Sequence, residues 1–95
     1  MKLMITPKAQ DWFKKEMEPT AGQGIKFYGK VYGKTQVHDG FSVGLAVDTP
    51  EQPLIEKKVN GMIFFVEESD EWFFKGYNLE VDYDEELDEP KYKFN

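Results

Sequence analysis

The chain has 95 residues, a net charge of −6 at pH 7, no cysteine and no arginine. Without cysteine it can form no disulfide, thiolate metal site or cysteine nucleophile, and its acidic balance argues against nucleic acid, whose phosphates require a basic face. The longest apolar run has five residues, which is too short to span a membrane, and the N-terminus has no signal-peptide pattern. We therefore expect a single domain, residues 1–95, located in the cytoplasm.

The first elements are a short strand and an amphipathic helix. Residues 2–5 are typical of a strand, Thr6 is a good N-cap, and Pro7 suits the first helical position, where a missing N–H costs nothing. The helix is expected to run from Pro7 to about Met17. Its apolar stripe, which should face the core, consists of Ala9, Trp12, Phe13 and Met17.

The rest of the chain is dominated by strand patterns, in residues 25–32, 41–47, 54–59, 62–66, 79–83 and 91–94. Within the first of these, Gly29 predicts a bulge or a close backbone approach. The connection 33–40 contains the only histidine and is too long for a tight hairpin. Asn60-Gly61 predicts a two-residue type I′ turn, because both central positions of that turn need positive φ. The continuous apolar run 62–66 indicates a strand that is covered on both faces.

A short helix is expected near residues 69–75, capped by Ser69 or Asp70 and ended by Gly76. An acidic loop, 84–89, should precede a final edge strand. Together these elements predict an α+β to mainly-β fold. Its antiparallel strands would form a sandwich-like sheet assembly with one N-terminal amphipathic helix.

The sequence contains no catalytic motif, so we expect a protein that is not an enzyme. His38 beside Asp39 could orient a metal ligand or a base, but the chain has no second histidine. A lone histidine in a polar loop is more often exposed or hydrogen-bonded. The acidic residues between positions 82 and 89 lack the spacing and the turn glycine of a calcium loop. No metal site is therefore assigned.

Two surface features leave a partner-binding role open. Residues 67–89 carry eleven acidic residues against the single Lys75, which indicates either an ordinary solvated surface or a docking face for a basic partner. Four aromatic residues either pack against the fold or form an exposed patch for a partner: Tyr28, Tyr32, Trp72 and Tyr77.

The stretch 60–83 resembles the C-terminal half of the HesB/IscA-type iron–sulfur cluster biosynthesis proteins. The family's pattern is a glycine-led strand, a short aromatic helix, a glycine and a returning strand, matched here by Gly61, Ile63, Phe65, Glu67, Gly76, Leu79 and Asp82. Residues 44–50 and 86–94 resemble further family segments, so the similarity spans nearly the whole chain and is nearest to the short HesB-like branch of Gram-positive bacteria. The resemblance implies the HesB-like fold, a role in iron–sulfur biogenesis, a protein partner and possible homo-oligomers.

The chain departs from that family in its ligands. The family uses three cysteines, one in the loop after the long strand and two in a C-x-C pair near the C-terminus, and this sequence has none. The loop that matches the first cysteine contains Lys34, Thr35 and His38, and neither Lys nor Thr replaces a thiolate. Iron or an iron–sulfur cluster is thus implied by resemblance alone. Two hypotheses follow: an iron–sulfur biosynthesis protein that is not a conventional cluster carrier, or a metal-free protein–protein interaction module on the same scaffold.

Overall fold

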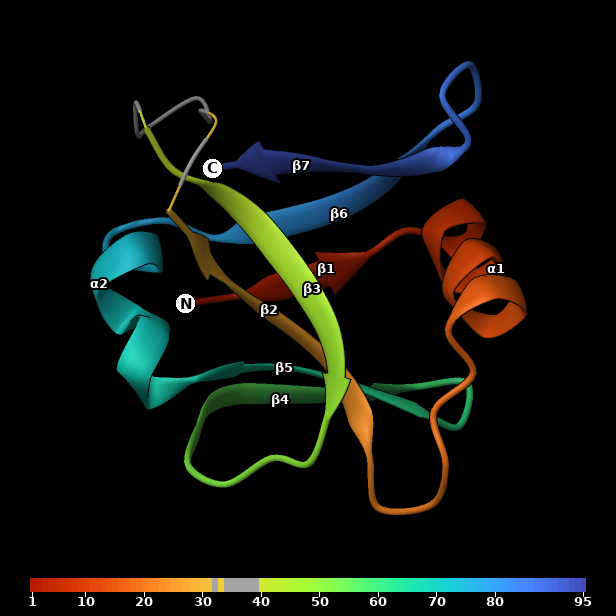
Figure 1. Ribbon diagram of the computed structural model, residues 1–95, viewed down its shortest axis with the longest axis horizontal. Coiled ribbons are helices and arrows are strands. Elements are labelled where there is room, and N and C mark those ends of the chain that lie inside the picture. The colour runs from red at the N-terminus through yellow and green to blue at the C-terminus, as the bar shows by residue number, and fades with distance from the viewer. Residues whose placement is uncertain (32, 34–39) are drawn as a thin grey trace.

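The structure is a computed structural model that describes residues 1–31, 33 and 40–95 (Figure 1). Its elements follow the chain in the order β1 (Leu3–Ile5), α1 (Pro7–Glu16), β2 (Gly24–Lys30), β3 (Ser42–Asp48), β4 (Pro53–Val59), β5 (Met62–Glu67), the 3-10 helix η1 (Glu68–Asp70), α2 (Glu71–Phe74), β6 (Leu79–Asp84) and β7 (Glu89–Phe94). The mainly-β class, with a helix after the first strand and a short helix before β6, is confirmed. Figure 1 shows the two helices on opposite sides of the strands.

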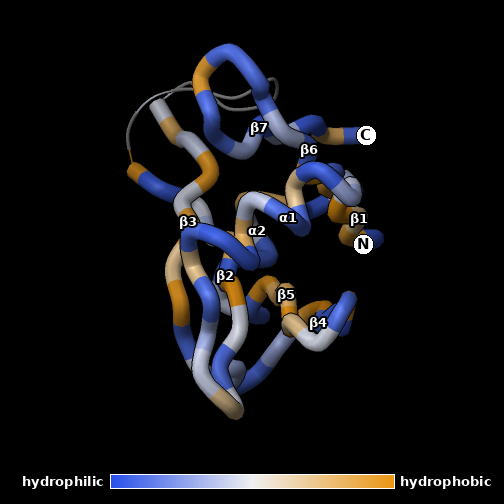
Figure 2. Tube along the Cα trace, turned by 90° about the vertical axis from the view of Figure 1, so that its right-hand side faces the viewer, coloured by the Kyte–Doolittle hydropathy of each residue, from blue (hydrophilic) through white to orange (hydrophobic). Residues whose placement is uncertain are grey.

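The strands form two mixed sheets, in the orders β1-β6-β7 and β3-β2-β5-β4. In Figure 2 the strands of the first sheet lie in the upper part of the molecule, with β4 and β5 below them. The pairs β2–β3, β4–β5 and β6–β7 are antiparallel, as expected. The structure differs from the expectation at β1–β6 and β2–β5, which are parallel. Both pairs join strands far apart in the chain, and a long crossover permits parallel pairing.

The start of α1 is the one the sequence predicts. The hydroxyl of Thr6 accepts a hydrogen bond from the backbone N–H of Ala9 at 3.3 Å, and Pro7 occupies the first turn. The same hydroxyl donates to a carboxylate oxygen of Asp82 at 2.9 Å. The cap therefore also fixes α1 to β6.

The apolar stripe of α1 faces the core. Ala9 and Phe13 are fully buried, whereas Trp12 and Met17 are partly buried against the same cluster. Trp12 lies at the edge of the stripe, where its indole N–H donates to the backbone carbonyl of Asp88 at 3.0 Å. The predicted stripe is confirmed, and its two flanking members remain partly open to solvent.

The core between the sheets is largely aromatic, with one group of rings near α1 (Phe13, Phe27 and Phe64) and another near α2 (Phe73, Phe74 and Phe94). Phe13 meets Phe64 edge-to-face at 5.3 Å between ring centroids, and Phe73 meets Phe94 at 5.9 Å. Among the described residues no polar or charged side chain is buried. Apolar burial and ring packing therefore hold the sheets and helices together.

The hairpin between β4 and β5 has the predicted turn. Asn60 has φ 48° and Gly61 has φ 80°, both positive as a type I′ turn requires. Phe64 and Phe65 are both fully buried, at 0% relative exposure. Because consecutive strand residues point to opposite faces, β5 is covered on both sides, as predicted.

The acidic loop between β6 and β7 is shorter than the predicted loop 84–89. Asp84 pairs with Glu89 at the ends of β6 and β7, so residues 84–89 form a hairpin whose turn covers only 85–88. The turn closes with Asp88 in a left-handed conformation, at φ 51°. β7 then runs along the edge of its sheet, which confirms the expected edge strand.

Candidate functional site

The most distinctive surface of the described residues surrounds α2, at the end of the molecule opposite α1 (Figure 1). Five exposed residues define this surface, here termed the α2 surface: Glu68, Glu71, Trp72, Lys75 and Tyr77. Trp72 is 50% exposed and Tyr77 is 36% exposed. Large aromatic side chains that stay this open on a small domain are candidate contacts for a partner.

The local sequence explains why Trp72 faces outward. Phe73 and Phe74 are buried in the core and fix the rotation of the single turn of α2. Successive helical residues differ by about 100° in direction, so the residue before this buried pair is turned toward solvent. Gly76 then redirects the chain toward β6. Its φ of 85° is a backbone conformation that a residue with a Cβ adopts only at a cost in free energy.

The indole of Trp72 is held in place although half of it is open. Its ring lies 5.3 Å from the ring of Phe41 and 5.5 Å from that of Phe73, both edge-to-face. Phe41 directly precedes β3, and Phe73 is part of the core. Trp72 is therefore a positioned aromatic group rather than a loosely tethered one.

Asp70 occupies the N-cap position of α2, as the sequence predicts, but the side-chain hydrogen bond expected of a cap is absent. Neither η1 nor α2 has a side-chain cap hydrogen bond. The Asp70 carboxylate instead accepts a hydrogen bond from the backbone N–H of Gly29 at 3.2 Å. A Cβ on Gly29 would lie 2.9 Å from the ring of Phe73, which confirms the predicted close approach. Asp70 thus joins β2 to α2.

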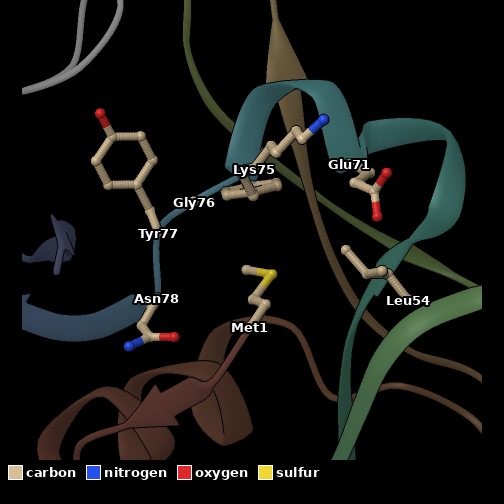
Figure 3. A pocket seen from close by; sticks show the side chains of 8 residues that line it. Met1, Leu54, Glu71, Lys75, Gly76, Tyr77 and Asn78 are labelled. Atoms are coloured by element: carbon tan, nitrogen blue, oxygen red, sulfur yellow. The ribbon is translucent and has the colours of Figure 1, made fainter.

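A small pocket lies beside the α2 surface, with a volume of about 210 Å³. Its lining comes from the N-terminus, from β4 and from the segment that leaves α2: Met1, Leu54, Glu71, Phe74, Lys75, Gly76, Tyr77 and Asn78. Figure 3 shows Met1 between Asn78 and Leu54, with Glu71 and Lys75 above it and the ring of Tyr77 pointing away from the centre. The pocket could not be predicted from the sequence, because no local pattern links three segments so far apart in the chain.

The surroundings of the α2 surface are acidic. Residues 67–75 contain four acidic residues and Lys75, a balance of −3 from −4 and +1. The Glu67 carboxylate is occupied, since it accepts the backbone N–H groups of Glu51 and Gln52 at 3.1 and 2.9 Å. Glu68 and Glu71 are exposed and form no ion pair with another described residue. Their charges are available to a partner.

The acidic β6–β7 hairpin is different, because its carboxylates serve the hairpin itself. Asp84 accepts two backbone N–H groups of the turn, at 3.0 and 3.1 Å. The Tyr83 hydroxyl donates to the Asp88 carboxylate at 2.6 Å, and this hydrogen bond raises the pKa of Tyr83 to about 12. Lys8 of α1 forms an ion pair with Glu85, which raises the pKa of Lys8. This segment holds its own turn and α1 together, which makes it the weaker candidate for docking.

The structure brings only part of the predicted aromatic patch together. Trp72 and Tyr77 are exposed near one another along the chain, as the patch interpretation requires. Tyr28 instead lies against Gly44, where an added Cβ would come within 2.4 Å of the Tyr28 ring. The Lys26 ammonium lies 5.7 Å from the centroid of the same ring. Tyr32 lies outside the described residues, as do the three candidates in the loop that matches the family's first cysteine, Lys34, Thr35 and His38.

The donor groups of the chain do not fit an iron–sulfur cluster. Such clusters use thiolate ligands, and none of the 95 residues is cysteine. Within residues 1–31, 33 and 40–95, no group of three His, Asp or Glu side chains is close enough to hold a metal ion. In the same part of the chain, no helix has both the length and the apolar character needed to cross a membrane.

Solved structures identify the type of fold. SufA of Escherichia coli, involved in biosynthesis of iron–sulfur clusters, superposes with a TM-score of 0.66 over 99% of this chain and 79% of its own, at 23% identity. IscA, solved with a 2Fe–2S cluster, superposes with a TM-score of 0.63 over 98% of this chain and 80% of its own, at 16% identity. The fold is thus of the SufA/IscA type over the whole chain, as the sequence predicted, on a protein without cysteine.

Sequence similarity identifies the family within this class. No family model matches the chain. The pyruvate dehydrogenase inhibitor of Bacillus subtilis (strain 168) is 35% identical over 94 residues, which cover 99% of both chains. The chain belongs to the same family as this inhibitor.

Proposed function

We propose that the chain is a protein-interaction module that inhibits pyruvate dehydrogenase by binding it, and that it has no enzymatic activity of its own. One observation carries this proposal: the 35% identity to the Bacillus subtilis inhibitor, which extends over 99% of each chain. An alignment without a large insertion or missing segment is what two proteins with the same mode of action would give. A cytoplasmic location is part of the proposal.

The chemistry of the chain supports binding rather than cluster transfer. A scaffold without thiolates cannot ligate a cluster as a conventional carrier does. It still displays a positioned aromatic group, Trp72, on the short helix that contributes Glu71 and Phe74 to a small pocket, together with the exposed carboxylates of Glu68 and Glu71. Aromatic anchors surrounded by polar groups are the usual components of a protein–protein interface.

The proposal is tested by titrating the full-length chain into a purified pyruvate dehydrogenase complex and measuring pyruvate-dependent activity. We expect saturable inhibition that depends on the ratio of chain to complex and is established without a time lag. Direct binding is measured in parallel by calorimetry. A small acidic protein of unrelated fold serves as the control for non-specific charge effects.

Two results would contradict this function. Full activity at every ratio, with no heat of binding, would exclude the complex as the target. Inhibition that grows with time at far less than one chain per complex would show that the chain modifies its target chemically, and would reject the non-enzymatic part of the proposal.

The second candidate function is an accessory role in iron–sulfur biosynthesis, which the SufA-like fold favours. It requires iron to be held without cysteine, through His38 and the loop around it or through an added thiol. Anaerobic reconstitution with ferrous iron and sulfide, followed by desalting, metal analysis and visible absorption, tests this. Stoichiometric iron with a charge-transfer band would support the second function. A colourless protein with an intact fold would leave the interaction module as the better explanation.

A further inference from the structure

The proposed function leaves open which surface contacts the enzyme, and the structure offers an answer at α2. Trp72 is half exposed but is fixed by edge-to-face contacts with Phe41 and Phe73 at 5.3 and 5.5 Å. A side chain already held in one orientation loses little conformational entropy when a partner covers it. Tryptophans that a partner covers are also enriched among the residues that dominate the binding energy of interfaces.

The pocket of Figure 3 has the size of a subsite for a single side chain. Its volume of about 210 Å³ is below the range of about 300–1,000 Å³ that is usual for small-molecule and cofactor sites. Met1, Leu54 and Phe74 give it an apolar wall, and Glu71 and Lys75 lie at its rim. An aliphatic side chain from a partner therefore fits this pocket better than a cofactor does.

The charge of the α2 surface indicates which residues should flank the partner's aliphatic side chain. The exposed carboxylates of Glu68 and Glu71 lie in the same short segment as Trp72, and the chain as a whole carries −6. A lysine or arginine of a partner can meet these carboxylates, and the face of an exposed indole attracts such a cation as well. An acidic partner would be repelled.

We propose that the α2 surface is the docking site for a basic segment of pyruvate dehydrogenase, which places an aliphatic side chain in the pocket and a cationic side chain against Trp72 and Glu71. This inference rests on the proposed function and adds to it the docking face and the chemistry of the partner segment. The β6–β7 turn provides the matched control, because Leu87 is 66% exposed and Glu86 is exposed in an acidic segment far from α2 (Figure 1).

The experiment compares four variants with the wild-type chain in the same titration of pyruvate dehydrogenase activity. Trp72→Ala removes the aromatic group, and Glu71→Lys reverses one charge of the α2 surface. Leu87→Ala and Glu86→Lys make the corresponding changes at the β6–β7 turn. We expect the concentration needed for half inhibition to rise by about tenfold or more for both α2 variants. It should stay within about twofold of the wild-type value for both turn variants.

Folding is checked separately, since Trp72 also contacts Phe41 and Phe73. Glu71 lies on the exposed side of α2, so Glu71→Lys tests the surface even if Trp72→Ala reduces thermal stability. Hydrogen exchange of the wild-type chain with the enzyme complex should protect the backbone of residues 68–77 and leave residues 85–88 unchanged.

Each outcome separates the docking face from the function. Wild-type inhibition with unchanged α2 variants, or protection confined to another face, would overturn the α2 surface while keeping the proposed function. Equal losses for Glu71→Lys and Glu86→Lys would show that total charge matters rather than this face. Absence of wild-type inhibition would overturn the proposed function and this docking partner together.

Discussion

At the scale of single residues, Gly29 is a position of close approach between β2 and α2. A Cβ at this position would lie 2.9 Å from the ring of Phe73, and that ring is fully buried. We expect Gly29→Ala to reduce the free energy of unfolding by about 1–3 kcal/mol, because an overpacked core shifts rather than compresses. Urea unfolding measures the loss. Combination with Phe73→Leu supplies the control: if the ring clash is the cause, Gly29→Ala costs less in that background.

Asp82 makes stability depend on pH through a single carboxylate. It accepts hydrogen bonds from the Tyr83 backbone N–H at 2.8 Å and the Thr6 hydroxyl at 2.9 Å, and these bonds lower the pKa of Asp82. A lowered folded-state pKa stabilises the fold above the ordinary aspartate value of about 3.9, and this stability is lost as pH falls through the lower pKa. Asp82→Asn keeps an acceptor but cannot ionise.

The expected result is a difference in unfolding free energy between wild type and Asp82→Asn that is present at pH 7 and shrinks toward pH 3. Denaturant titrations at several pH values provide the comparison. The other carboxylates titrate in both proteins, so their contribution cancels in the difference. A gap that stays constant over this range would mean that the charge of Asp82 contributes nothing to stability.

At the scale of elements, α1 shows how far a sequence pattern determines energetics. Phe13 is fully buried, whereas Trp12 is partly buried at the edge of the same stripe. Phe13→Ala should cost about 3–5 kcal/mol of unfolding free energy, and Trp12→Ala should cost less than about 3 kcal/mol, because solvent already reaches part of the indole. Guanidinium unfolding of both variants tests the order. A larger loss at Trp12 would place that residue, not Phe13, at the centre of the helix contact.

Elements whose signals lie within a few residues could be predicted, and elements that depend on distant partners could not. Thr6-Pro7 and Asn60-Gly61 specify their cap and turn locally, and both are present. Asp70 has the residue type of a cap, but the backbone of Gly29, 41 positions away, takes its carboxylate. Propensity gives the residues that can cap a helix, whereas packing decides which hydrogen bond forms.

At the scale of the whole molecule, the parallel pairs and the pocket were beyond prediction for the same reason. β1 pairs with β6, although most of the chain separates the two strands in sequence. This pairing brings the N-terminus beside the segment that follows α2. Met1 and Leu54 then line one pocket with Tyr77. Trp72 and Tyr77 could be named from the sequence as candidate surface aromatics. Their combination with a pocket requires the long-range pairing, which has no local signal.

The net charge of the molecule makes a further prediction about inhibition. If the acidic α2 surface meets a basic segment, salt should weaken the contact, since the screening length falls from about 10 Å at 0.1 M to about 3 Å at 1 M. Raising sodium chloride from about 0.05 to 0.5 M should therefore increase the concentration of wild-type chain needed for half inhibition. Measuring this concentration at several salt values gives a slope for each variant.

The two charge-reversal variants distinguish a local field from a global one. Glu71→Lys and Glu86→Lys both change the net charge from −6 to −4, because each replaces −1 by +1. A contact through α2 requires the salt slope to flatten for Glu71→Lys and to remain close to wild type for Glu86→Lys, since exposed charges more than a screening length from the contact contribute little. Equal slopes for the two variants would assign the salt effect to total charge. A wild-type slope of zero would contradict an electrostatic contribution to the contact.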